Sequence, residues 1–165
     1  MSKIELREKA YLIRNTLDQK LASNNVIKQI IESKILVEYK KIGIYFPIKN
    51  EISLLNLLDF YPDKEFYLPK TEGYIKFIKY KRDDALKVSR FGVPEPDGIP
   101  DTPEILLVPM VAANHFNYRL GYGGGYYDNY LKNFNGPKIG ICYKELVMDF
   151  TPNTWDIPLD MVILG

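Results

Sequence analysis

The chain has 165 residues, of which 46% are hydrophobic and 26% charged, and its 22 basic residues nearly balance 21 acidic ones. This composition predicts a single globular domain over residues 1–165 and excludes a disordered, collagen-like or coiled-coil chain. The balanced charge argues against a nucleic-acid partner, which requires a strong basic excess. No apolar run reaches the roughly 18 residues that span a bilayer, and the first residues form no signal sequence. We expect a soluble, cytoplasmic and monomeric protein with no nucleic-acid or membrane partner.

The chain contains one cysteine and one histidine, which limits the chemistry open to it. These counts exclude an internal disulfide, a cysteine zinc cluster and metal sites built on paired histidines. Cys142 lies in an apolar run, so we expect a buried thiol and not a nucleophile. His115 lies in a polar stretch, where we expect a solvated loop position.

The N-terminal sequence predicts a helix with a basic face. Ser2 and Glu5 have the spacing of a capping box, and apolar residues then recur at steps of three and four. Lys3, Arg7 and Arg14 fall on a common side of this helix. On their own, these cations indicate only a solvated helix face.

The chain then alternates between helical and extended patterns. Further helices are expected over about residues 18–39 and 53–60, and a proline-rich loop over 91–103. The expected strands cover residues 42–46, 65–69, 74–80, 105–109, 138–143 and 161–164. Pro47 and Pro69 are expected to end the first two of them. The alternation predicts an α/β fold, a three-layer sandwich with a mostly parallel central sheet and helices on both faces.

The most unusual stretch holds four of the chain's eleven glycines between positions 121 and 125. Glycine lets backbone N–H groups approach a ligand closely, and a helix expected near Gly125 would begin with its positive dipole end. Arg119 adds a cation beside this loop, and Asp128 could hold a metal ion against phosphate oxygens. The glycine spacing matches neither the Walker loop nor the dinucleotide fingerprint. From these residues alone, a phosphate cradle and a ligand-free turn with aromatic packing are equally consistent.

The run from Arg119 to Asp128, Arg-Leu-Gly-Tyr-Gly-Gly-Gly-Tyr-Tyr-Asp, resembles the signature of the 5-formyltetrahydrofolate cyclo-ligase family. Other segments fit the family in the same order along nearly the whole chain. They are Lys3–Arg7, Tyr45–Glu51, Phe91–Pro96, Leu107–Pro109 and Asp156–Asp160.

This resemblance implies an enzyme that uses ATP and Mg²⁺ to convert 5-formyltetrahydrofolate into 5,10-methenyltetrahydrofolate, with release of ADP and phosphate. It implies catalytic roles for Arg119 and Asp128, and a Mg²⁺ site made by Asp128 and Asp156. The ATP contacts that it implies are Lys3, Arg7, Arg119, Leu120, Gly121, Tyr122, Gly123, Gly124, Gly125, Tyr126 and Tyr127. The folate contacts that it implies are Phe46, Glu51, Tyr122, Gly123, Gly124, Gly125 and Tyr126.

Several positions depart from the family's common pattern: Gly124 and, upstream of it, Met110, Ala113, Asn114 and Asn117. Several relatives carry lysine where this chain has Gly124, so Lys3, Arg7 and Arg119 would have to neutralise the phosphates. Asn117 stands where family members often have glycine, and asparagine tolerates the left-handed backbone region.

Simpler interpretations stay open for several of these residues. Glu51 could cap the helix expected near Ser53, and Asp156 and Asp160 could form turns. Trp155 is expected to be a packing residue. At the level of the whole protein, the alternatives are a non-catalytic nucleotide- or folate-binding module and an α/β enzyme that acts on a sugar phosphate or a coenzyme A derivative.

Overall fold

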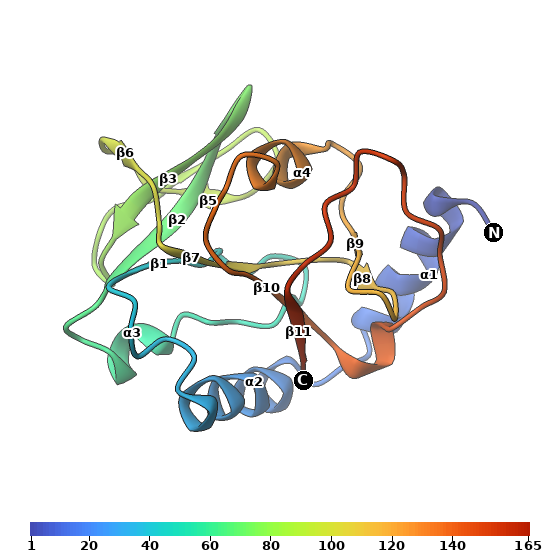
Figure 1. Cartoon of the computed structure of the whole chain (residues 1–165), viewed down its shortest axis with the longest axis horizontal. Helices are drawn as coiled ribbons and strands as arrows, with labels where there is room; N and C mark the ends of the chain where they lie inside the picture. The colour runs from blue at the N-terminus through green and yellow to red at the C-terminus, as the bar shows by residue number, and fades with distance from the viewer.

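The computed structural model describes all residues from 1 to 165 and has the predicted α/β architecture. Its central sheet has seven strands in the order β11-β10-β7-β1-β2-β3-β6 (Figure 1). These strands are β1 (Lys41–Gly43), β2 (Glu65–Glu72), β3 (Tyr74–Tyr80), β6 (Pro100–Asp101), β7 (Ile105–Val108), β10 (Lys138–Cys142) and β11 (Met161–Leu164). Strands β11, β10, β7, β1 and β2 pair in parallel, whereas β3 is antiparallel to both of its neighbours. The prediction of a mostly parallel sheet is confirmed.

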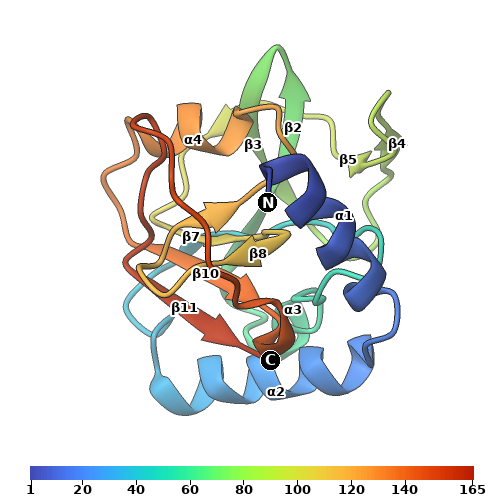
Figure 2. The same cartoon turned by 90° about the vertical axis from the view of Figure 1, so that its right-hand side faces the viewer.

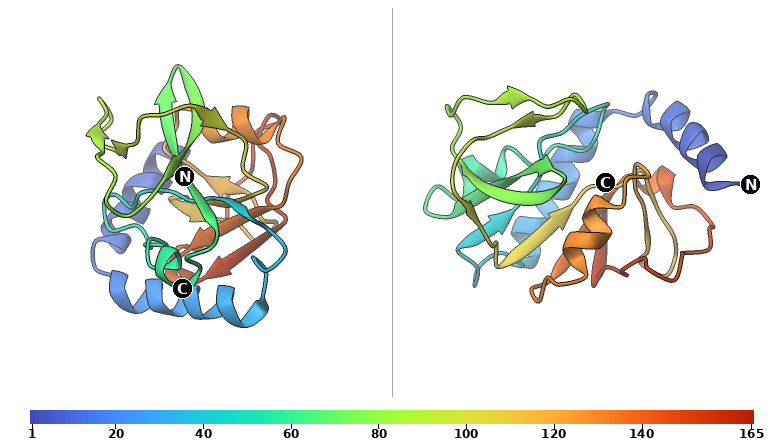
Figure 3. Two further views of the ribbon diagram at one scale, coloured as in Figure 1. Left: turned by 90° about the vertical axis from the view of Figure 1, so that its left-hand side faces the viewer. Right: turned by 90° about the horizontal axis from the view of Figure 1, so that it is seen from above.

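Helices lie on both faces of this sheet, as predicted (Figure 1). The α-helices are α1 (Lys3–Arg14), α2 (Gln19–Ser33), α3 (Leu57–Phe60) and α4 (Tyr126–Leu131). Helices α2 and α3 cover one face and α4 the other, while α1 stands at the side of the sheet (Figures 2 and 3). Shorter elements complete the fold: the 3₁₀-helix η1 (Lys144–Leu146) and the pairs β4 (Lys87–Val88) with β5 (Pro94–Glu95) and β8 (Ala112–Ala113) with β9 (Arg119–Leu120). No helix has the length and apolar character needed to cross a membrane.

Helix α1 begins as its sequence predicts. The Ser2 hydroxyl accepts a hydrogen bond from the Glu5 backbone N–H, and the Glu5 carboxylate accepts one from the Ser2 N–H, which completes the capping box. Helix α2 is shorter than the expected 18–39, because Lys34 adopts a left-handed conformation with φ 58° that ends the helix. The helix expected over 53–60 is reduced to its last turn, α3.

The expected end of the second strand at Pro69 is wrong, because β2 continues to Glu72. The Glu65 N–H and the Tyr67 carbonyl both bond toward β1, so alternate residues of β2 direct their backbone polar groups to that side. Pro69 continues this alternation and directs its nitrogen away from β3. Strand β1 has ended by that point, so the missing N–H removes no ladder hydrogen bond.

The core lies around the parallel strands, as one cluster of 37 buried residues. All four residues of β7 are buried, which confirms the expectation for its apolar run. From β1 the chain moves to β2 on one side, and from β7 to β10 and β11 on the other. This reversal between adjacent strands is a topological switch point, and ligands of open α/β sheets bind outside the carboxyl ends of the strands there.

Candidate active site

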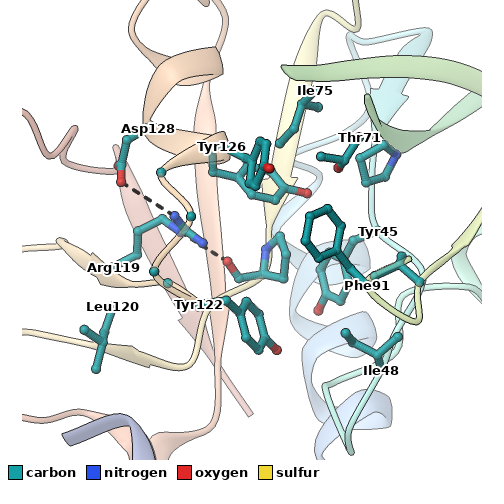
Figure 4. Close-up of a pocket in the computed structure, with 18 of the residues that line it drawn as sticks. Tyr45, Ile48, Thr71, Ile75, Phe91, Arg119, Leu120, Tyr122, Tyr126 and Asp128 are labelled. Carbon is teal, nitrogen blue, oxygen red and sulfur yellow. Dashed lines mark hydrogen bonds and ion pairs between the residues drawn. The ribbon is translucent and has the colours of Figure 1, made fainter. Parts of the chain in front are cut away.

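The principal pocket lies at this switch point and has a volume of about 510 Å³. Tyr45 and Phe46 follow β1 at its mouth, and Pro109 follows β7. In Figure 4, Arg119, Asp128 and the glycine-rich loop form one wall, while Tyr45, Ile48 and Ile75 are grouped on the other. A volume of this size suits a small organic ligand or a pair of ligands held side by side.

Every residue that the sequence analysis assigned to a ligand lines this one pocket. The set comprises Lys3, Arg7, Phe46, Glu51, Arg119, Leu120, Gly121, Tyr122, Gly123, Gly124, Gly125, Tyr126, Tyr127, Asp128 and Asp156. The structure therefore brings together residues from both ends and the middle of the chain. Which ligand each residue contacts stays a prediction.

The glycine-rich loop joins β9 to α4 and needs glycine at two positions for conformational reasons. Gly123 has φ 104° and Gly125 has φ 72°, both in the region where other residues are strained. Gly121 is needed for space instead, because a Cβ there would lie 2.8 Å from the Arg119 Nη2. The loop thus exposes its backbone to the pocket while Arg119 packs directly beneath it.

Arg119 is the buried cation of the site, with only 8% of its surface exposed. Its Nε donates a hydrogen bond to the Pro109 carbonyl at 3.3 Å, and its Nη1 lies 4.0 Å from the Asp128 Oδ2 (Figure 4). The guanidinium also packs 5.0 Å from the centre of the Tyr127 ring. Burial lowers the pKa of Arg119, and the Asp128 carboxylate opposes that shift. These contacts fix a positive charge under the glycine-rich loop.

Helix α1 brings two more cations to the same side of the pocket. The Arg7 Nε donates to the Gly121 carbonyl at 2.7 Å, and the Lys3 Nζ lies 3.3 Å from the Asp156 Oδ2. Since these residues are four apart on one helix, they reach the loop from a single rigid element. Their common side is therefore a wall of the site and not merely a solvated face.

Asp128 and Asp156 come from separate segments and meet at this end of the pocket. The Asp156 Oδ2 accepts a hydrogen bond from the Asn153 N–H at 2.7 Å, and the Asp128 Oδ1 accepts one from the Ile157 N–H at 3.5 Å. Burial raises the pKa of Asp128, Arg119 lowers it, and the nearby Asp156 raises it again. No group of three or more metal-binding side chains occurs in the molecule. Two carboxylates match Mg²⁺, which completes its shell with water and substrate phosphates.

Glu51 supplies a buried carboxylate beside the glycine-rich loop, next to Tyr122. Its Oε1 accepts a hydrogen bond from the Ile48 N–H at 2.8 Å, and its Oε2 accepts one from the Tyr122 hydroxyl at 2.7 Å. Burial raises the pKa of Glu51, and these two hydrogen bonds oppose the shift. The alternative of a helix cap near Ser53 is wrong, because both oxygens are engaged elsewhere.

Apolar side chains line another part of the pocket. Phe91 comes from the loop between β4 and β5, and its ring meets the edge of Tyr126 with a centroid distance of 5.9 Å. Phe46, Pro69 and Ile75 add further apolar surface. A flat heterocycle that enters the pocket would therefore meet aromatic and aliphatic side chains.

Comparison with known proteins agrees with this geometry. The family model described as the 5-formyltetrahydrofolate cyclo-ligase family matches residues 2–165. The chain belongs to that family. The protein named 5-formyltetrahydrofolate cyclo-ligase from Mycoplasma pneumoniae is 32% identical over 94% of this chain and 98% of its own length. Its namesake from Haemophilus influenzae is 30% identical over 90% of this chain and 88% of its own length.

Two solved structures of cyclo-ligase relatives share the fold. The NMR structure of Aquifex aeolicus 5,10-methenyltetrahydrofolate synthetase superposes with a TM-score of 0.85 and 35% identity, covering 99% of this chain and 90% of that one. A 5,10-methenyltetrahydrofolate synthetase from Mycoplasma pneumoniae gives 0.81 and 28%, covering 99% and 98%. The predicted family resemblance, fold and enzyme class of the chain are confirmed.

Several residues of this cyclo-ligase pocket were not predicted from the sequence. The expectation that Trp155 packs inside is wrong, because its side chain lines the pocket and is 68% exposed. Glu95 was noticed only as part of a loop, yet it is buried in the pocket wall, where one oxygen accepts a hydrogen bond from the Thr71 N–H at 2.9 Å. Tyr11 also lines the pocket, four residues after Arg7 on the same side of α1, and that spacing could have predicted it.

Three smaller expectations are confirmed. Cys142 is buried, and burial raises the pKa of its thiol to about 12. His115 is exposed in a loop, 3.7 Å from the Asp149 carboxylate. Asn117 has φ 65° and so occupies the left-handed region, as expected where relatives use glycine.

Proposed function

We propose that the protein converts 5-formyltetrahydrofolate into 5,10-methenyltetrahydrofolate and couples the reaction to the cleavage of ATP to ADP and phosphate. The observation that carries this proposal is one pocket lined by two chemically different sets of residues. One set is the glycine-rich loop with Lys3, Arg7 and Arg119, which suits a polyphosphate. The other set is Glu51 with aromatic and aliphatic side chains, which suits the ring N–H donors and flat face of a pterin.

The chemistry requires activation of a poor leaving group. The formyl oxygen attacks the γ-phosphorus of ATP and ADP departs. N10 of the folate then adds to the formyl carbon and loses its proton, and the C–O bond breaks to release phosphate with the methenyl bridge formed. Such phosphoryl transfer needs positioning and charge neutralisation more than covalent catalysis by the protein. This explains why no nucleophilic cysteine or serine–histidine pair is needed.

In this proposal, the basic side chains hold the triphosphate and Arg119 neutralises charge on the transferred phosphoryl group. Asp128 and Asp156 would hold Mg²⁺, which shields phosphate oxygens when bound. The buried hydroxyl of Tyr127 has no protein partner and so offers a hydrogen bond to a ligand. We propose further that the protein works as a monomer in the cytoplasm, where ATP is available.

The test is a spectrophotometric assay with 5-formyltetrahydrofolate, ATP and Mg²⁺ that follows the near-ultraviolet band of the methenyl product. Product should form only when ATP is present. Asp128→Asn should slow turnover by more than about 100-fold, whereas Asp149→Asn should not, because the Asp149 carboxylate is exposed and lies outside the pocket. Folate binding without ADP formation would instead indicate a sequestering module, and absence of folate binding would refute the proposal.

A further inference from the structure

Arg14 is a fully buried cation that the reaction scheme above does not use. It lies at the end of α1 with 1% of its surface exposed, and no carboxylate forms an ion pair with it. Its Nη2 donates a hydrogen bond to the Tyr122 hydroxyl at 3.1 Å, but its Nε and Nη1 are buried without a partner. A buried arginine normally pairs with an acid, because an uncompensated charge away from water is strongly destabilising. Packing alone therefore does not explain why the charge of Arg14 is buried.

A directed hydrogen-bond chain links this cation to Glu51. The Tyr122 hydroxyl accepts from Arg14 and donates to the Glu51 Oε2 at 2.7 Å. The guanidinium also lies over the Tyr122 ring at 5.8 Å and over the Tyr11 ring at 5.3 Å, so two aromatic faces hold it in place. The phenol thus connects a fixed positive charge to a carboxylate.

Few charged groups other than Arg14 face Glu51. Arg119 is the second cation near it, but Arg119 also faces Asp128. Lys49 lines the same pocket two residues before Glu51, and Cys142 lines a small cavity together with Arg14 and Glu51. The other titratable neighbours are phenols, and burial raises the pKa of each, so they stay neutral at physiological pH. They are Tyr11, Tyr45, Tyr122, Tyr127 and Tyr143. Arg14 is therefore a cation that is linked to Glu51 through one phenol.

The turn before Glu51 is tied to the same end of α1. Lys49 and Asn50 both have positive φ, 48° and 63°, a conformation that residues other than glycine and asparagine rarely adopt. The Asn50 side-chain amide donates to the Arg14 carbonyl at 2.7 Å and to the Leu17 carbonyl at 3.0 Å. The backbone of Arg14 thus helps to hold the turn, while its side chain acts on the carboxylate that the turn presents.

We propose that Arg14 is a positioning residue that, through Tyr122, keeps Glu51 ionised and aimed into the pocket as a hydrogen-bond acceptor. The ligand that benefits, a folate with ring N–H donors, rests on the proposed function. The electrostatic role of Arg14 does not, because it concerns only groups of the chain itself. Arg14 touches neither substrate in this scheme and acts only through another side chain.

The experiment measures the ionisation of Glu51 directly. The protein is labelled with carbon-13 at glutamate side-chain carboxyls, and the Glu51 resonance is assigned by its absence in Glu51→Gln. Its titration is followed in wild type, in Arg14→Met, which keeps the volume but not the charge, and in Arg14→Lys. We expect the midpoint to rise by about one pH unit or more in Arg14→Met and to return toward wild type in Arg14→Lys. An unchanged midpoint in folded Arg14→Met refutes the proposal.

A second variant covers the case in which Arg14→Met does not fold. Tyr122→Phe keeps the buried charge but removes the hydroxyl that connects it to Glu51, so the midpoint should rise here too. An unchanged midpoint in Tyr122→Phe would refute transmission through this phenol. This titration requires no substrate, so its outcome is separate from that of the turnover assay.

Kinetics supply the functional readout. The acid limb of the pH profile of kcat/KM for folate should move to higher pH in Arg14→Met and back toward wild type in Arg14→Lys. At pH values above this limb, the kcat/KM values of the variants and of wild type should converge. A uniform loss of kcat/KM at every pH would show a merely structural role and overturn the proposal. If wild type fails to turn over folate, the proposed function falls, and the carboxyl titration alone decides the role of Arg14.

Discussion

Gly121→Ala tests whether Arg119 is held rigidly beneath the glycine-rich loop. Gly121 does not have a positive φ, so alanine introduces no left-handed strain there. Its Cβ would lie 2.8 Å from the Arg119 Nη2 and 2.9 Å from the Nη1. Because ordinary contact begins near 3.4 Å, the guanidinium must retreat by about 0.6 Å. The Pro109 carbonyl and the Tyr127 ring hold that group, so the retreat is resisted.

Overpacking of this kind lowers the free energy of unfolding by about 1–3 kcal/mol, which urea denaturation can measure. A displaced cation should lower kcat/KM for ATP by about 10-fold to 100-fold in the methenyl assay. The double variant with Arg119→Lys should recover part of the stability, since the slimmer lysine relieves the contact, but not the activity.

The matched control is Gly73→Ala, which has φ 76° in the turn between β2 and β3 and no atom within 4 Å of its Cβ. It should lose about 1–2 kcal/mol of stability through backbone strain and keep its activity. If Gly121→Ala retained both the stability and the kcat/KM of wild type, Arg119 would not be fixed under the loop, and the reasoning would be wrong.

Three further predictions follow from the buried and exposed groups of the pocket and core. Burial raises the pKa of Asp128, so the folded state favours its protonated form, and this stabilisation is present below about pH 3.8 and lost as pH rises through the folded pKa. At pH 7, Asp128→Asn should therefore unfold at a higher urea concentration than wild type, and this difference should disappear below pH 3.8. Its turnover should be more than about 100-fold slower. A lower stability of the variant at pH 7 would contradict this reasoning. Trp155 is the only tryptophan and lines the pocket, so the addition of nucleotide with Mg²⁺ should change its fluorescence. Lys3→Ala should weaken that binding. If the fluorescence did not change even at saturating nucleotide, the nucleotide would bind elsewhere. Cys142, with a pKa of about 12 and a buried sulfur, should resist alkylation at pH 8 until urea unfolds the chain; rapid labelling of the native protein would disprove its burial.

The sequence predicted the features that depend on neighbouring residues. The capping box located the start of α1, and the apolar run of β7 identified a central strand. The positions of Lys3 and Arg7 on one helical side follow from spacing alone, so their common direction was visible before the structure. The glycine-rich loop was predicted from its composition, but its ligand was not.

The features that the sequence could not predict depend on contacts between distant segments. The burial of Arg14 requires Tyr122, which is 108 residues away, and nothing near Arg14 in the chain distinguishes it from the basic residues before it. The left-handed end of α2 occurs at Lys34, without the glycine that usually marks such an end. The hairpin of β8 and β9 is missed because strands of two residues carry no periodicity.

The continuation of β2 through Pro69 has a consequence for how the chain behaves in a crowded solution. Past Tyr67, this side of β2 no longer has β1 as a neighbour, and an open strand edge with free N–H groups can recruit a strand from another molecule. Here Pro69 has no N–H to offer, and the next outward donor, that of Thr71, is occupied by the Glu95 carboxylate. The edge of β2 beside the pocket can therefore stay unpaired without offering another chain a strand edge on which to aggregate.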